Sequence, residues 1–145
     1  MTNPYDEALG ATLIERSIRE RIVIVEDSRE LGFDLVPTDE VREIGIPAVV
    51  ERIRERVGDA KVYVSFDVDF VDPAYAPGTG TPEIGGYTSR EAQEFVRGLA
   101  GIDIVGCDVV EVYPSYDGPG QITSLLAANV AYELLSLVAR RNDDG

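Results

Sequence analysis

The stretch KVYVSFDVDF, residues 61–70, decides the fold, because an apolar run ends there in two carboxylates spaced two residues apart. Residues 61–66 are dense in valine and aromatic side chains, a composition typical of a strand buried on both faces. Side chains alternate along a strand, so Asp67 and Asp69 are expected to point to the same side at its carboxyl end. Ligands of parallel α/β sheets bind beyond this end of the strands, which makes the pair a candidate site.

The segments on either side of this strand predict an α/β domain. Thr88 followed by Glu91 is a capping box that opens a helix, and apolar residues at helical spacing indicate two more helices. The expected elements are helices at 47–57, 88–99 and 121–139 and a second apolar strand at 102–112. Helices that alternate with strands favour parallel strands joined by right-handed crossovers.

Three other segments of the chain have recognisable residue patterns. Residues 72–86 contain too many prolines and glycines for regular structure, and their ordered pattern indicates a functional loop rather than a linker. Nearer the amino terminus, a short helix is expected at 12–20 and a strand at 21–25. The acidic segment 27–45 has a mixed pattern with breakers and predicts no regular element.

The composition of the chain indicates which classes of binding partner and which cellular location to expect. The chain has 145 residues with 27 acidic and 13 basic side chains, a formal net charge of −14, and Lys61 is its single lysine. This charge excludes nucleic acid and anionic membranes as expected partners, and acids spread along the whole chain indicate adaptation to high salt. With one cysteine, no signal peptide and no apolar run of 18 residues, a cytoplasmic location is expected.

The carboxylates after the first strand have two interpretations. Asp67 and Asp69 can share a metal ion or a pair of ions, because both point to one side of the sheet edge. Alternatively Asp67 ends the strand, Asp69 forms an Asx-turn and Asp72 forms another before proline, which are common structural roles for aspartate. The spacing by itself leaves both interpretations open.

A second pair of carboxylates, Asp108 and Glu111, lies near the end of the second apolar strand. Acids among apolar neighbours need a partner, which here is a metal ion, a substrate guanidinium or an arginine of the chain. Strand parity places the two on opposite faces unless a bulge intervenes. Cys107 reads as a small buried hydrophobe, and the absence of histidine excludes Ser-His and Cys-His catalysis. The glycines at 78 and 80 lack the lysine of a P-loop.

The amino-acid sequence of these motifs resembles that of a known family. SFDVDFVDP at 65–73, followed by APGTGTPE at 76–83 and Gly-Gly at 85–86, is similar to the ureohydrolase signature of the agmatinase/arginase family. DVVEVYP at 108–114, with Tyr-Asp at 116–117, looks like the family's final strand. The resemblance covers roughly residues 60–138 and implies that the chain is a single partial domain, the C-terminal half of the family domain.

The resemblance implies a three-layer α/β/α fold with a mostly parallel sheet, incomplete on its N-terminal side. It also implies Mn²⁺-dependent hydrolysis of a guanidinium C–N bond to release urea, usually by an oligomer. Asp67 would bridge two metal ions and Asp69 would bind one of them. Glu111 would receive the substrate guanidinium, and the loop carrying Thr81 and Glu83 would contact the substrate. The proline-rich sequence of the loop looks more like agmatinase than arginase. The resemblance therefore favours agmatine as substrate, with formiminoglutamate and guanidino acids as alternatives.

The chain also departs from the family pattern. It contains no histidine, so the Gly-Gly-Asp-His and Asp-Ala-His-x-Asp segments that supply the other metal ligands are absent, and the match begins about midway through the family domain. One hypothesis is an enzyme half that is completed by another chain carrying the N-terminal half, or that works as a homo-oligomer. The other is a non-catalytic remnant that serves as an assembly or binding module.

Overall fold

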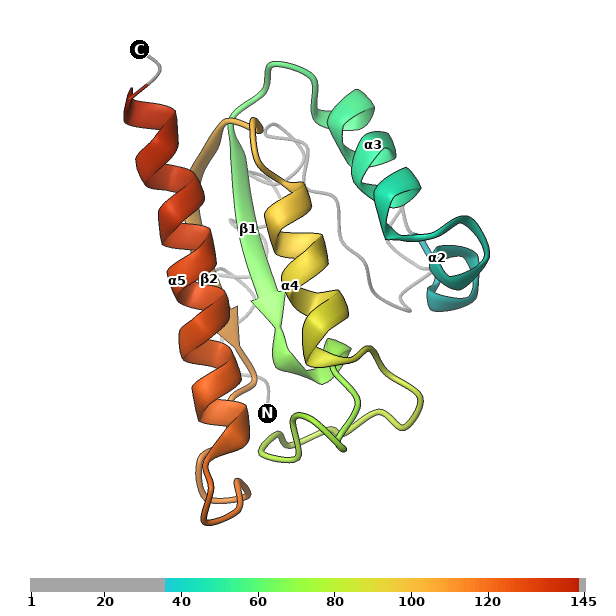
Figure 1. Ribbon diagram of the computed structural model, residues 1–145, viewed down its shortest axis with the longest axis vertical. Coiled ribbons are helices and arrows are strands. Elements are labelled where there is room, and N and C mark those ends of the chain that lie inside the picture. The colour runs from blue at the N-terminus through green and yellow to red at the C-terminus, as the bar shows by residue number, and fades with distance from the viewer. Residues whose placement is uncertain (1–35, 144–145) are drawn as a thin grey trace, which may run out of the picture.

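The computed structural model describes residues 36–143, in which helices alternate with two strands (Figure 1). The elements are α2 (Thr38–Ile44), α3 (Ile46–Val57), β1 (Val62–Asp67), the 3-10 turn η1 (Val68–Phe70), α4 (Ser89–Gly98), β2 (Ile104–Val110) and α5 (Ile122–Asp143). The helices and strands expected after residue 46 are therefore confirmed, with boundaries shifted by a few residues. The helix and strand expected at 12–20 and 21–25 lie outside the described residues.

The two strands run parallel, as the sequence predicted, and α4 connects them (Figure 1). Their register pairs Ser65 with Asp108 and Asp67 with Val110, so the carboxyl ends of both strands meet at one edge. The pairing requires glycine at position 106, because a Cβ there would lie 2.8 Å from the ring of Tyr63. The chain is thus an α/β unit with its first candidate carboxylate next to the end of β2.

Burial alternates along β1, so the prediction of a strand buried on both faces was wrong. Val64 and Phe66 are half-buried and join a hydrophobic cluster with residues of α4 and α5, whereas Tyr63 and Ser65 are exposed. Apolar helices therefore lie against one face of β1. The valine and aromatic content of a strand does not by itself show whether one or both of its faces are buried.

The long helix α5 buries one side and exposes the other. Leu126, Val130 and Leu134 pack in the cluster between β2 and α4, while Leu125 and Leu135 remain 68% and 61% exposed. Within the described part of the chain, α5 alone has the length and composition of a membrane span, which the sequence had not indicated. Core helices of soluble proteins meet the same criterion, and the buried side of α5 packs on the sheet.

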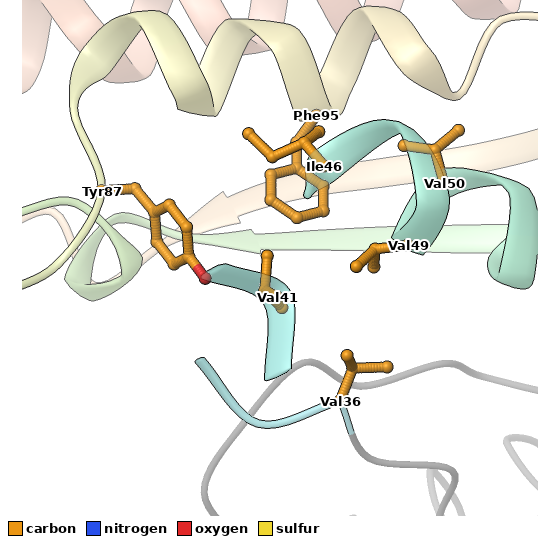
Figure 2. Close-up of a cluster of buried hydrophobic side chains, with 7 residues drawn as sticks. All are labelled: Val36, Val41, Ile46, Val49, Val50, Tyr87 and Phe95. Atoms are coloured by element: carbon orange, nitrogen blue, oxygen red, sulfur yellow. The ribbon is translucent and has the colours of Figure 1, made fainter. Parts of the chain in front are cut away.

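The helices α2 and α3 form a second cluster with α4 and the segment before it (Figure 2). Its members are Val36, Val41, Ile46, Val49, Val50, Tyr87 and Phe95. The helix α2 was not predicted, because it has no side-chain cap at Pro37 and buries a single residue, Val41. In contrast, the capping box before α4 is confirmed: the Thr88 N–H donates to Glu91 over 2.7 Å and the Glu91 N–H donates to the Thr88 hydroxyl over 3.2 Å.

Candidate active site

Asp67 ends β1 and shapes the turn that follows it. Its carboxylate accepts a hydrogen bond of 2.9 Å from the backbone N–H of Asp69, which caps the 3-10 turn Val68–Phe70. The local role considered for Asp69, an Asx-turn, therefore belongs to Asp67, two residues earlier. One Asp67 oxygen is engaged inside the turn, and the same carboxylate lies at the sheet edge where the site was expected.

Asp69 connects the strand end to the loop 72–86. Both of its carboxylate oxygens accept hydrogen bonds from hydroxyl groups, one from Thr79 and the other from Thr81. Thr79 is fully buried, which fixes this part of the loop over the end of β1. Thr81, expected to contact substrate, is in this structure a partner of Asp69.

Asp72 closes the loop as the structural interpretation proposed. Its two oxygens accept backbone N–H groups of Ala74 and Gly85, each over 2.8 Å. Val71 and Tyr87 form a parallel bridge at the base of the same loop. Hydrogen bonds from Ala74 and then Gly85 hold the pKa of Asp72 below its usual value. The loop is therefore an ordered structure closed by one carboxylate.

The lowered pKa of Asp72 predicts a pH-dependent contribution to stability. A carboxylate whose folded pKa is depressed stabilises the fold above its unfolded pKa of about 4, and this contribution is lost as pH falls through the folded pKa. We expect Asp72→Asn to unfold at lower urea concentration than wild type near neutral pH, and the gap to close as pH falls through the lowered folded pKa of Asp72. Asp59→Asn, at an exposed position past α3, is the matched control. A gap that stays constant with pH would contradict the role of the ionised Asp72.

At the end of β2 the backbone turns sharply at Glu111. The strand stops at Val110 rather than at the expected residue 112, because Glu111 has a φ of 62°, which an extended strand does not allow. Strand parity therefore does not govern the direction of its side chain. Since Val110 pairs with Asp67, Glu111 follows directly beside the end of β1. The backbone N–H of Tyr113 then donates to the carbonyl of Gly78 over 2.7 Å and joins this segment to the loop.

A pocket of about 260 Å³ opens between this segment and the loop 72–86. Its lining residues are Gly80, Glu111, Val112, Tyr113 and Tyr116. Glu111 was predicted from the sequence as a site residue. The two tyrosines were not, although they follow it closely in the motif EVYPSYD. Of the two loop residues expected to contact substrate, neither Thr81 nor the exposed Glu83 lines this pocket.

Asp108 has a different partner from the one expected. The hydroxyl of Tyr63 donates to one of its oxygens over 2.9 Å, across the pair of strands, and the other oxygen is buried without a hydrogen-bond partner. The hydrogen bond with Asp108 is the main reason that the pKa of Tyr63 is raised. Among the described residues, the hydrogen-bond partner of Asp108 is thus a phenol, a donor without a second charge, and not a cationic side chain. Cys107 packs in the core, and burial raises the pKa of its thiol, in agreement with a structural role.

The loop 72–86 is also attached to the start of α5. The Gly78 N–H donates to the buried hydroxyl of Thr123 over 2.7 Å, while Asp117 accepts the N–H groups of Ser124 and Thr123 over 2.8 and 3.2 Å. A Cβ at position 78 would lie 2.7 Å from the Cβ of Asp117, so only glycine fits this approach. The loop is therefore held by β1, β2 and α5 together.

The donor set fits a divalent metal in type but not in number. Carboxylate oxygens suit Mn²⁺, and Asp67 and Asp69 provide them at one sheet edge. Among the residues that the structure describes, no three histidine, cysteine, aspartate or glutamate side chains gather closely enough to hold a metal ion. Within the described part of the chain, Asp67 and Asp69 therefore do not form a complete metal cage.

Parallel strand ends that carry carboxylates, next to an ordered loop, define an α/β protein with a candidate site at the carboxyl edge of its sheet. Residues 14–136 match the model of the arginase family, and the chain belongs to that family. It is 46% identical over 129 residues to guanidinobutyrase from Pseudomonas aeruginosa, a match that covers 87% of this chain and 40% of that protein. With the mitochondrial agmatinase of Gallus gallus it shares 50% identity over 107 residues, 74% of this chain and 31% of that protein.

Solved structures agree with this assignment. The crystal structure of a hypothetical agmatinase from Burkholderia thailandensis superimposes with a TM-score of 0.78 at 38% identity, covering 92% of this chain and 46% of that one. The α/β unit therefore has the arginase-family fold. The chain spans less than half the length of each of these relatives.

Proposed function

We propose that the arginase-family domain to which this chain contributes hydrolyses the guanidinium C–N bond of a guanidino compound and releases urea. Agmatine is the first substrate proposed, because the relatives include an agmatinase and the pocket carries a carboxylate. One observation carries the proposal: the parallel register sets Asp67 beside Val110, so Asp67, Asp69 and Glu111 all follow adjacent strand ends. Two adjacent strand ends thereby carry the three carboxylates at one edge of the sheet.

Within this proposal Asp67 and Asp69 would hold Mn²⁺ at the carboxyl end of β1. Bound divalent ions of this kind lower the pKa of water and stabilise developing negative charge. The hydroxyls of Thr79 and Thr81 orient Asp69 at the edge. The remaining ligands would come from the part of the family domain that lies outside the match.

Glu111 is proposed to receive the guanidinium group of the substrate. A carboxylate and a guanidinium form paired, charge-assisted hydrogen bonds, which fix both the charge and the plane of the ligand. The positive φ of Glu111 directs the chain away from the strand and into the pocket wall. Thr81 and Glu83 are proposed to contact the substrate from the loop.

The exposed side of α5 supports a proposal about what completes the domain. Leu125, Tyr132 and Leu135 are 68%, 69% and 61% exposed and recur at a helical spacing of seven and three residues, so they form one row, the α5 row. Soluble proteins rarely leave such a row open to water. We propose that the α5 row packs against the rest of an arginase-family domain, in a three-layer α/β/α arrangement, because more than half of each relative lies outside the match.

A non-catalytic binding or assembly module is the second candidate function. It is favoured by the hydrogen bonds that already satisfy Asp69 and by the incomplete metal cage within the described residues. In this case the α5 row would still associate with a partner, but the carboxylates would stabilise the loop and bind no metal. The two candidates therefore differ in metal binding and in urea release.

The deciding experiment pairs this chain with the segment of P. aeruginosa guanidinobutyrase that lies outside the match, produced together as a complemented assembly. We expect Mn²⁺-dependent urea release from agmatine by the assembly, and weaker Mn²⁺ binding by the chain alone in calorimetry. Association without Mn²⁺ binding or urea release would instead establish the binding module. A full-length guanidinobutyrase serves as the positive control for the assay.

A further inference from the structure

The pocket beside Glu111 has an aromatic wall that the family assignment does not explain. Tyr113 and Tyr116 line it together with Glu111, and their rings meet edge to face with centroids 4.3 Å apart at 89°. The Tyr116 N–H donates to the Tyr113 carbonyl over 2.9 Å, which closes a turn that presents both rings. The wall is thus organised before any ligand binds.

The same turn is fixed at its other end. The Tyr113 N–H donates to the carbonyl of Gly78 over 2.7 Å, and Gly78 itself contacts Asp117 and Thr123 at the start of α5. Glu111, immediately before the turn, keeps a φ of 62° that a residue with a side chain rarely adopts. Strain of this kind persists where the surrounding structure enforces it, and it marks functional positions.

The chemistry of the pocket points to one class of ligand. No lysine or arginine is among its lining residues, so its single formal charge is the carboxylate of Glu111. A guanidinium that pairs edge-on with a carboxylate leaves its flat face free, and such a face stacks on aromatic rings through cation–π attraction. The volume of about 260 Å³ suits a small head group with a short alkyl chain rather than a larger ligand.

We propose that Tyr113 and Tyr116 are specificity-determining residues that hold the flat face of an alkylguanidinium while Glu111 holds its edge. This inference rests on the proposed function for the role of Glu111. It adds that the chain recognises guanidinium without Mn²⁺, and that ligands with a cationic or neutral tail bind better than guanidino acids. A carboxylate tail would approach Glu111 and the acidic chain without a compensating basic side chain in the pocket.

The test is an NMR titration of the full chain with agmatine in high salt and without Mn²⁺, following the tyrosine ring signals. Putrescine, which has the same chain and a second amine in place of guanidinium, measures charge attraction alone, and 4-guanidinobutyrate measures the effect of the tail. We expect saturable binding in the order agmatine, 4-guanidinobutyrate, putrescine. Tyr113→Leu and Tyr116→Leu should each weaken agmatine binding up to about fivefold, while the matched phenylalanine variants keep it within about twofold.

The variants distinguish failure of the aromatic wall from failure of the proposed role of Glu111. Equal binding by the leucine variants and wild type, or equal loss in the leucine and phenylalanine variants, would overturn the aromatic wall. If agmatine does not bind more tightly than putrescine, the guanidinium site itself is excluded. Glu111→Gln should abolish the preference for agmatine over putrescine; loss there, with unchanged leucine variants, would leave the proposed role of Glu111 intact and remove only the tyrosines.

Discussion

Asp69→Asn is expected to lower Mn²⁺-dependent urea release by the complemented assembly about a thousandfold. The reason is that asparagine keeps an oxygen for one threonine hydroxyl, so the loop contact partly survives, but the anionic metal ligand is lost. Stabilisation by a bound metal is worth several kcal/mol, and each factor of ten in rate corresponds to about 1.4 kcal/mol. The measurement is urea release at saturating agmatine, with the Mn²⁺ dissociation constant measured alongside.

Asp59→Asn makes the same chemical change at an exposed position past α3 and is expected to leave the rate unchanged. Thermal unfolding of both variants checks that the fold is intact. Wild-type rates and Mn²⁺ affinity in Asp69→Asn would show that this carboxylate only ties the loop, which is the structural interpretation of the motif. A rate lost together with the folded state would indicate that the role of Asp69 is structural.

Replacing Leu125 and Leu135 together by aspartate is expected to weaken association with the complementing segment by more than a hundredfold. Burying one leucine contributes roughly 1.5–3 kcal/mol, so losing two contributions exceeds the roughly 2.7 kcal/mol that a hundredfold change represents. Aspartate adds the cost of burying an unpaired charge. Both side chains are exposed in the structure, so the chain itself should remain folded. Affinity is measured by surface-immobilised binding in high salt.

Ile44→Asp is the matched control, because Ile44 is also an exposed apolar residue but belongs to α2, away from α5 (Figure 1). Its association with the segment should equal that of wild type. Unchanged association in the double variant would move the contact surface away from the α5 row. Equal losses in the control and the double variant would show a general effect of added negative charge on an already acidic chain.

Local patterns in the sequence were sufficient for most of the secondary structure after residue 46. The capping box at Thr88 and Glu91 and the helical spacing in α3 and α5 depend on neighbours within one or two turns, so they can be read without the fold. The parallel pairing followed from the alternation of strand and helix. The helix α2 was missed because its stability comes from packing of Val41 in the cluster with Tyr87 and Phe95, a long-range contact.

For the candidate site, the sequence determined which carboxylates lie at strand ends and that an ordered loop follows them. Only the tertiary structure decided what those groups contact. Asp69 meets hydroxyls ten and twelve residues away, and Asp108 meets a tyrosine of the other strand. The turn at Glu111 and the pocket wall of Tyr113 and Tyr116 likewise depend on the bond to Gly78. Residue types and spacing fix local geometry, whereas hydrogen-bond partners distant in sequence become neighbours only once the sheet, the loop and α5 have packed together.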